Sequence, residues 1–304
     1  MSDLFRRAVL TVTHRGPVRR LITGTAAGRR LSHRFVAGDD LADAETVARR
    51  LNAEGFRVSL DHLGEHVADR KEALRARDDY LACLERIAAA GLDANISVKL
   101  THLGLDFDRA FAADALVELA AKAKEVGTTV TVDMEESRYT EATIELYAGA
   151  QAELGNLGIA LQAYLHRTAD DLVRLLPLGG HIRLCKGAYA EPPEVAFQRR
   201  EDVDANFDHL LRILMAAPDV VPAIATHDDA RIRLALRLAA DRVGPWEFQM
   251  LYGVRRDLQR RLVAEGHALR VYVPYGSAWY PYLTRRLAER PANLLFFGRA
   301  VVGR

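Results

Sequence analysis

A segment near the C-terminus carries four polar side chains at helical spacing. They are Tyr282, Arg285, Arg286 and Glu289, at positions i, i+3, i+4 and i+7 of a predicted amphipathic helix, so they share one face. Two adjacent guanidinium groups form a multi-donor fork that suits a carboxylate or a phosphate. This face predicts a site for a small anion. The alternative is a solvated face in which Arg and Glu pair along the helix.

A second set of polar residues lies on or just after short apolar runs that predict β-strands. These residues are Asp61, His62, Glu65, Lys99, Asp133, Gln162, Arg183, Lys186, Tyr272 and the Thr226-His227-Asp228 segment. A cation that points into an apolar interior is costly unless an anion pairs with it. Lys99 and Arg183 therefore imply a bound ligand or a carboxylate such as Asp133 between them. A purely structural ion pair is the alternative for each.

Eight strand-like segments alternate with amphipathic helical segments from residue 56 onward. The strand segments are residues 56–60, 95–100, 128–132, 159–163, 181–185, 221–226, 247–251 and 269–273. Such βα units predict a (β/α)8 TIM barrel, whose chemistry lies at the carboxyl ends of the strands. The sixth strand is the weakest prediction, because Pro222 would have to stand at its first residue. A doubly wound sheet is the alternative fold, but no GxGxxG sequence follows any strand.

Residues 1–54 precede the barrel and predict a helical arm, and residues 55–304 form the predicted barrel with its sites. The arm shows helical patterns near residues 3–13, 15–27 and 41–53. Leu4, Phe5, Val9 and Leu10 make an apolar stripe in the first of them. The stripe either packs on the barrel or contacts a membrane or another protomer.

Composition excludes several classes of protein. Lys and Arg number 42 against 41 Asp and Glu, a formal net charge of +1, so no overall positive field favours nucleic acid. Cys83 and Cys185 lie far apart without CxxC spacing, which argues against a disulfide framework or a zinc site and suits a reducing compartment. No run approaches the roughly 18 apolar residues of a membrane span. We therefore expect a soluble, cytoplasmic protein.

Several segments of the chain resemble the signature sequences of the proline dehydrogenase family. They are residues 181–189, 225–227, 270–276 and 282–289, together with residues 34–38 and 63–65. The resemblance spans about residues 30 to 300, and the length of the chain resembles that of the monofunctional bacterial form. It implies a distorted barrel that binds FAD and oxidises L-proline to Δ1-pyrroline-5-carboxylate by hydride transfer to flavin N5. The electrons would pass to a quinone, which implies at least transient contact with the inner face of the cell membrane.

The resemblance also implies roles for individual residues. Asp133 and Arg183 match catalytic positions, Asp133 at the substrate and flavin and Arg183 beside flavin N5. The matched substrate-binding residues are Lys99, Tyr189, Leu251, Tyr272, Tyr282, Arg285 and Arg286, with the two arginines clamping the proline carboxylate. The matched FAD-binding residues are Met134, Gln162, Arg183, Lys186, Gly187, Ala188, Thr226, His227 and Glu289. Glu65 matches a glutamate that pairs with the first clamp arginine.

The sequence departs from the family pattern at two positions on the adenine side of the FAD site. Ala190 stands where relatives often have Trp, and Asp228 stands where Asn is common.

Two other classes of function fit the same barrel less well. A metal-dependent hydrolase could use His62, His66, His102, His166 and His227, but the His-x-His and the final Asp that such a site needs are missing, so we expect no metal. A binding scaffold would not need Lys, Asp, Arg and an arginine fork around one pocket. The predicted class is therefore a flavin-dependent oxidoreductase.

Overall fold

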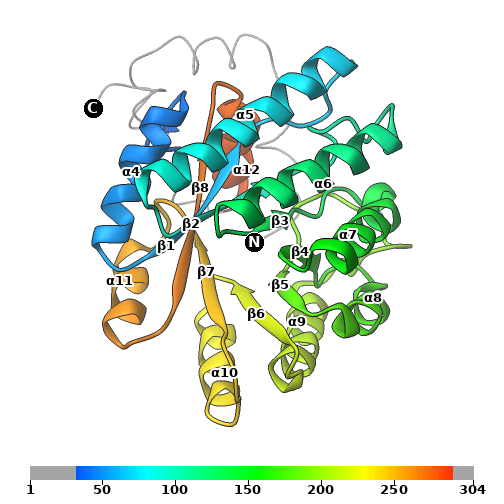
Figure 1. Cartoon of the computed structure of the whole chain (residues 1–304). Helices are drawn as coiled ribbons and strands as arrows, with labels where there is room; N and C mark the ends of the chain where they lie inside the picture. The colour runs from blue at the N-terminus through cyan, green and yellow to red at the C-terminus, as the bar shows by residue number, and fades with distance from the viewer. Residues whose placement is uncertain (1–31, 290–304) are drawn as a thin grey trace, which may run out of the picture.

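Eight parallel strands form a closed barrel in a computed structural model of the chain, which describes residues 32–289 and side chains as far as Thr284. Each strand pairs with its neighbours in sequence, and β8 closes on β1 (Figure 1). The strands are β1 (Arg57–His62), β2 (Ala94–Val98), β3 (Val130–Val132), β4 (Leu157–Gln162), β5 (Gly180–Cys185), β6 (Val220–Ala225), β7 (Glu247–Leu251) and β8 (Leu269–Tyr275). All eight predicted strands are confirmed, and the fold is a (β/α)8 barrel.

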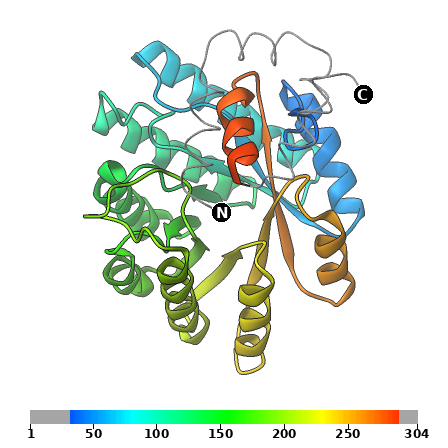
Figure 2. The ribbon, with the colours of Figure 1, turned by 180° about the vertical axis from the view of Figure 1, so that it is seen from behind.

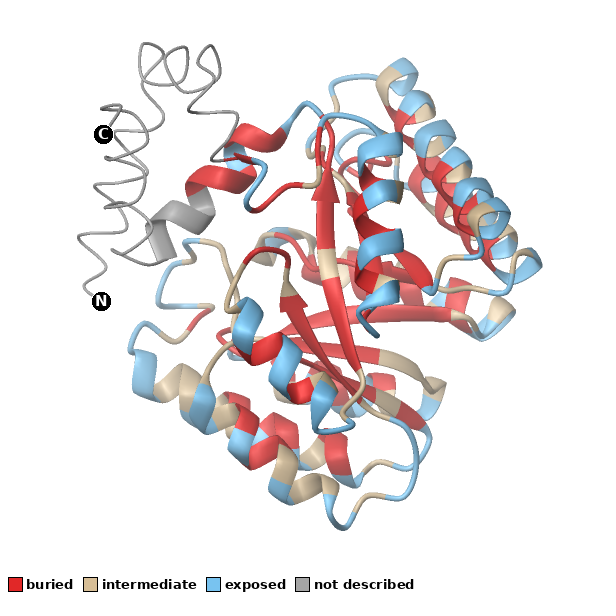
Figure 3. Ribbon diagram, turned by 90° about the vertical axis from the view of Figure 1, so that its left-hand side faces the viewer, coloured by how far each residue is buried: buried red, intermediate tan, exposed pale blue. Residues whose placement is uncertain are grey.

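Helices surround the barrel and bury their apolar faces against it (Figure 3). They are α4 (Leu41–Ala53), α5 (Arg70–Ala90), α6 (Arg109–Glu125), α7 (Thr140–Leu154), α8 (Thr168–Leu175), α9 (Arg200–Ala216), α10 (Asp229–Ala239), α11 (Arg256–Ala264) and α12 (Trp279–Glu289). Two short 3₁₀ turns lie at Ser137–Tyr139 and Leu176–Leu178. None of the helices within residues 32–289 is long and apolar enough to cross a membrane.

The sequence signals at several helix ends have clear structural counterparts. The side chains of Asp40, Asp69 and Asp108 accept hydrogen bonds from backbone N–H groups in the first turns of α4, α5 and α6. Gly91 ends α5 with a φ of 61°, in the left-handed region that glycine adopts without strain. These local signals fix where the helices start and stop around the barrel.

Pro222 does not stand at the first residue of β6, so this expectation was wrong. It is the third residue of the strand and lies opposite Ile182 of β5. The strand tolerates it because β6 pairs with β7 only from Ala223 onward, where Ala223 lies opposite Glu247. Proline therefore stands in a stretch that β7 does not yet flank.

The barrel is distorted at the point where it closes. α4 packs against β1 and β8, the place that the helix after β8 occupies in a regular barrel. α12 instead lies beside the carboxyl end of β8 (Figure 2). Its residues Trp279, Tyr282 and Leu283 pack in one apolar cluster with Leu63 after β1 and Tyr272 of β8. α12 thus covers the end of the barrel where a catalytic site is expected.

α4 coincides with the third helical pattern predicted for the N-terminal arm. The other two patterns and the Leu4, Phe5, Val9 and Leu10 stripe lie outside the described residues. The proposed division of the chain at residue 54 stays a prediction.

Candidate active site

Asp133, directly after β3, is the centre of a buried cluster of charged residues. One carboxylate oxygen accepts a hydrogen bond from the Arg183 guanidinium, and the other accepts one from the Tyr272 hydroxyl at 2.6 Å. The Lys99 ammonium lies 3.6 Å from that second oxygen. The structure therefore brings together Lys99, Asp133, Arg183 and Tyr272, four of the residues that the sequence singled out.

Lys99 is shared between two carboxylates. It donates a hydrogen bond to Asp61 at 2.9 Å, and both side chains are almost fully buried. Burial alone would lower the pKa of Lys99, but the negative charges of Asp61 and Asp133 outweigh it and hold that pKa well above its usual value. Lys99 is therefore an ammonium ion in this site. The sequence placed Asp61 at the end of a strand but did not identify it as the partner of Lys99.

Arg183 is held by residues from three other strands. Besides Asp133, its guanidinium donates to the Ser97 hydroxyl at 2.9 Å and, through Nε, to the side-chain oxygen of Gln249. It also lies over the ring of Tyr272, with 5.2 Å between the guanidinium carbon and the ring centroid. The orientation of this cation is thus fixed on several sides.

His227, which follows β6, is hydrogen-bonded to Leu251 at the end of β7. The backbone N–H of Leu251 donates to Nε2 of His227 at 3.1 Å, so Nε2 carries no proton and Nδ1 is the protonated nitrogen of a neutral ring. Arg255 donates to the backbone oxygen of His227 at 2.7 Å. A predicted cofactor residue and a predicted substrate residue are thereby linked directly.

Gln162 at the end of β4 offers an unused acceptor. Its amide nitrogen donates to the backbone oxygen of Met134 at 2.9 Å. Its side-chain oxygen is buried and accepts no hydrogen bond from the described part of the chain. A buried acceptor without a donor is costly, so this atom fits a ligand that supplies an N–H or O–H group.

Gly187, just after β5, has no side chain to cover its backbone. Its φ is 117°, and a Cβ there would lie 2.2 Å from the ring of Tyr164. Only glycine satisfies both conditions, so the loop brings its backbone closer to neighbouring groups than any other residue could. Together with Gln162 and Met134, this loop fits the flat, donor-bearing ring system of a flavin and the phosphates attached to it.

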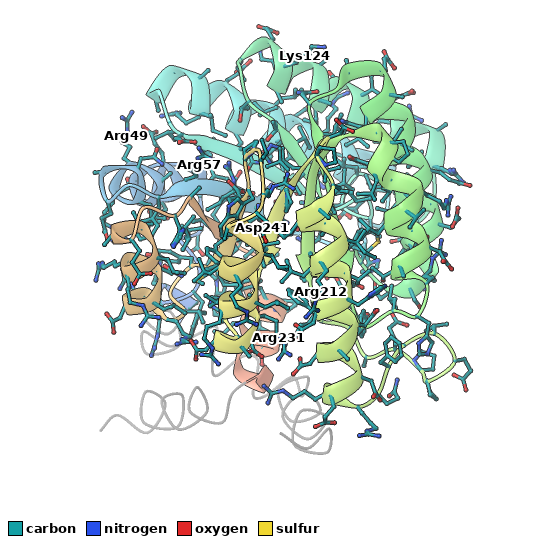
Figure 4. All side chains as sticks on the ribbon, turned by 90° about the horizontal axis from the view of Figure 1, so that it is seen from below. Arg49, Arg57, Lys124, Arg212, Arg231 and Asp241 are labelled. Carbon is teal, nitrogen blue, oxygen red and sulfur yellow. The ribbon has the colours of Figure 1, made fainter. Side chains whose placement is uncertain are left out.

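Lys186 is paired with carboxylates and does not stand alone. Its ammonium contacts Asp204 of α9 and also Asp228, which lies 2.8 Å away. Arg231 of α10, labelled in Figure 4, joins the same network through Asp204 and Asp208. Asp228 also begins α10, because its side chain accepts from the N–H of Ala230. Asp228, where the family commonly has Asn, therefore places an extra negative charge beside Lys186, a predicted FAD-binding residue.

A further buried acid, Glu135, was not recognised in the sequence. Its carboxylate accepts hydrogen bonds from the backbone N–H and the hydroxyl of Thr101, and burial raises its pKa to about 7. The Thr101 hydroxyl in turn accepts from the backbone N–H of His66, at 3.2 Å. These bonds join the loops that follow β1, β2 and β3. The only sign of Glu135 in the sequence was that a second acidic residue follows Asp133 and Met134 at the end of the third strand.

His66, Glu135 and Glu136 are also the one group within the described residues that could hold a metal ion. His66 is already bonded to Asp106 at 2.8 Å through Nδ1, and its Nε2 lies 3.4 Å from Glu136. An ion-paired histidine accounts for this group, and the expected absence of metal stays a prediction.

The remaining predicted residues are only partly placed. Tyr282 is buried on α12, and Thr226 is buried at the end of β6. Tyr189 is half-buried in the loop after Ala188, and Ala190 is exposed. Arg285, Arg286 and Glu289 belong to α12, but their side chains lie outside the described part of the structure. Glu65 is close enough to Lys99 to contribute to raising its pKa, after the larger effect of Asp61.

The fold and the site define a barrel enzyme with buried, paired charges at the carboxyl ends of its strands. Comparison with known proteins makes the class specific: the family model for proline dehydrogenase matches residues 44–299. The chain belongs to the proline dehydrogenase family, and it is an oxidoreductase.

Individual relatives agree with this assignment. The chain is 39% identical to proline dehydrogenase 1 of Bacillus subtilis subsp. natto over 92% of each chain. It is 38% identical to proline dehydrogenase of Deinococcus radiodurans over 97% of each. Its fold is similar to proline utilization A (PutA) of Bdellovibrio bacteriovorus inactivated by N-propargylglycine, with a TM-score of 0.82 and 23% identity over 94% of this chain. The chain spans only 36% of that larger protein.

Proposed function

We propose that this protein oxidises L-proline to Δ1-pyrroline-5-carboxylate with bound FAD, as the first step of proline catabolism. The observation that carries the proposal is the buried group of Lys99, Asp133, Arg183 and Tyr272 beneath a helix that bears Arg285 and Arg286. Bound FAD supplies the acceptor for hydride at N5 of its ring system. Gln162, Met134, Gly187, Ala188, Thr226, His227, Lys186 and Glu289 are the residues proposed to hold it.

Substrate binding separates the two ends of proline. Arg285 and Arg286 clamp the carboxylate, since a guanidinium fork matches its two oxygens. Lys99 adds positive charge on the barrel side, and Glu65 closes the site by pairing with Arg285. Tyr189, Leu251, Tyr272 and Tyr282 enclose the ring and exclude water, so the reacting carbon has one orientation.

The nitrogen of proline must be neutral before the ring can give up hydride. It carries a proton in neutral solution, and a pocket that combines Lys99 and Arg183 with the Arg285 and Arg286 clamp disfavours a further positive charge. The site therefore selects the unprotonated amine. Asp133 acts as an acceptor that orients Arg183 and Tyr272, because both of its oxygens already receive hydrogen bonds. Arg183 stabilises the negative charge that reduction brings to the cofactor.

Loss of hydride from the ring carbon and of the proton from nitrogen gives the imine product, and two electrons remain on the cofactor. A quinone receives these electrons in the proposed cycle. Because quinones reside in lipid, the protein then contacts the inner face of the cell membrane peripherally.

Anaerobic titration of the purified, FAD-loaded protein with L-proline tests the proposal. We expect the visible flavin absorbance to bleach with L-proline and to persist with D-proline. Arg285→Met and Arg286→Met should raise the proline concentration for half-maximal rate by about 10- to 150-fold, the equivalent of about 1.5 to 3 kcal/mol, with unchanged FAD content. A protein that binds no flavin, or a flavin that L-proline leaves oxidised, would overturn the assignment.

A further inference from the structure

The inner face of β7 carries a directional chain of hydrogen bonds that ends at Arg183. Glu247 and Gln249 are two residues apart on the strand, so both side chains point into the barrel, and both are buried. The amide nitrogen of Gln249 donates to Glu247 at 2.7 Å. The amide oxygen of Gln249 accepts from Nε of Arg183.

The neighbours of Gln249 permit only one orientation of its amide. A guanidinium has only donors, and an ionised carboxylate has only acceptors. Rotating the amide by half a turn would place its NH2 group against Arg183 and its oxygen against Glu247. Both contacts would then be repulsive in a buried setting, so the arrangement is fixed by chemistry.

Glu247 is itself anchored from β8. Arg270 donates to it at 2.8 Å and also donates to the backbone oxygen of Val58 at 2.9 Å. Burial alone would raise the pKa of Glu247, but Arg270 brings it below its usual value. The glutamate is therefore a permanent acceptor at the far end of the chain.

Gln249 supplies the contact that completes the positioning of Arg183. Asp133 and Ser97 hold the two terminal nitrogens of the guanidinium, and Gln249 holds the Nε edge. Three contacts on one planar group determine its plane as well as its position. Without Gln249, the Nε edge loses this acceptor, and the ring of Tyr272 is left to limit tilting of the plane.

We infer that Gln249 is a positioning residue, which fixes the plane of the Arg183 guanidinium and thereby sets how strongly Arg183 favours the reduced cofactor. This inference rests on the proposed function, because Arg183 acts there on bound FAD. Glu247 and Arg270 are the anchor that orients Gln249. The prediction concerns the redox step and leaves the carboxylate clamp on α12 untouched.

Gln249→Met in the FAD-loaded protein tests this role, because methionine has a similar volume and no strong acceptor. The rate constant of flavin reduction at saturating proline should fall about 10- to 100-fold, as expected for a misplaced catalytic group. The midpoint potential of the flavin should become more negative. The proline concentration for half-maximal rate should change by less than about threefold, since ground-state binding is unaffected.

Gln249→Glu provides a second test with a distinctive pH dependence. A carboxylic acid at this position keeps both bonds of glutamine, since its O–H donates to Glu247 and its C=O accepts from Arg183. Two adjacent buried carboxyl groups share one proton and lose it as the pH rises. This variant should therefore resemble the parent at low pH. Its midpoint potential should fall below the parent's as the pH rises.

The outcomes separate the inference from the proposed function. A crystal structure of cofactor-free Gln249→Met should show the Arg183 guanidinium turned away from its plane in the parent, and thermal unfolding should show a folded protein. A parental potential and reduction rate in Gln249→Met, with only a lower melting temperature, would reduce Gln249 to a structural role. If Gln249→Met does not fold, a parental potential in Gln249→Glu at every pH leads to the same conclusion. The proposed function would stand in either case, because it fails only if the parent binds no flavin or if L-proline leaves the parent's flavin oxidised.

Discussion

The charges around Asp133 balance one another before any substrate binds. Lys99 and Arg183 are two buried cations, and Asp61 and Asp133 are their two carboxylate partners. An isolated buried charge is far more costly than a paired one, so this balance lets the barrel carry them. It also means that most of the positive charge of Lys99 and Arg183 is already neutralised when a substrate carboxylate arrives. The two arginines of α12 are therefore needed in addition to Lys99.

The ammonium of Lys186 is neutralised by two carboxylates, and this predicts the effect of Asp228→Asn. In the parent, Asp228 and Asp204 both neutralise the Lys186 ammonium, which is proposed to face the FAD phosphates. Asparagine removes one negative charge and keeps an oxygen for the first turn of α10. The dissociation constant of FAD should fall by about two- to fivefold, the size expected for a partly exposed ion pair. Fluorescence titration of the cofactor-free protein with FAD measures it.

Asp229→Asn is the matched control for this substitution. Asp229 is the next residue, makes the same change in net charge, and pairs with Arg255 at 2.9 Å. An equal gain in FAD affinity for both variants would mean that overall charge is responsible and that Lys186 is not.

Among the elements, the connection between α9 and β6 is bridged by the Arg242 side chain. Arg242, after α10, donates to the backbone oxygens of Met215 and Ala217 at 2.9 Å and of Val220 at 2.6 Å. The last carbonyls of a helix lack partners within the helix, so these bonds satisfy groups that would otherwise be buried unpaired. One guanidinium thereby joins the end of α9 to the start of β6.

Arg242→Ala should destabilise the protein through this connection. Leaving these backbone oxygens without a donor is expected to lower the free energy of unfolding by about 2 to 4 kcal/mol, because a charged donor serves several of them. Urea unfolding monitored by circular dichroism gives the value. Arg237→Ala on the exposed side of α10 is the control, with an expected change within about 0.5 kcal/mol. Equal losses for both variants would contradict the assigned role of Arg242.

Across the whole molecule, the sequence predicted the helices and strands better than it predicted where they pack. In particular, it did not predict that α4 takes the place of the helix that follows β8 and that α12 lies over the end of the barrel. The period of apolar residues is a local property, so eight strands could be located from it. The positions of α4 and α12 depend on packing between distant segments. The backbone oxygen of Arg34, for example, packs so closely on Gly253 that a Cβ there would lie 1.7 Å from it. Periodicity carries no such information.

The candidate site was predictable where a residue is unusual by itself. Lys99 and Arg183 stand out in apolar strands, but Gln249 and Glu247 become visible only when the strand register shows that they face inward beside Arg183. Gln249 lies two residues before Leu251 on the same strand, so the two side chains point to the same face of the sheet. This spacing is the signal that could have identified Gln249. The pairing of Thr101 with Glu135 links positions 34 residues apart, and no local pattern encodes it.

Glu135 predicts how the stability of the whole protein responds to pH. Burial raises its pKa from 4.5 to about 7, so between these values the folded protein keeps a proton that the unfolded chain has released. Its contribution to stability is complete below pH 4.5 and is lost as the pH rises through about 7. Glu135→Gln resembles the protonated acid, since its oxygen can accept from the Thr101 N–H while its NH2 donates to the Thr101 hydroxyl. The variant should equal the parent near pH 5 and exceed it by about 2 to 3 kcal/mol above pH 8.

Urea unfolding of the FAD-saturated parent and variant at pH 5, 6, 7 and 8 measures this difference. His102 works in the opposite direction, because burial lowers its pKa to about 3 and stability is lost as the pH falls below 6.5. That effect cancels in the comparison, since both proteins contain His102. Glu136→Gln makes the same charge change at a partly exposed neighbour and should show no comparable rise. A stability difference between Glu135→Gln and the parent that stays constant from pH 5 to 8 would mean that Glu135 binds no more protons in the folded protein than in the unfolded chain, which would contradict a raised pKa.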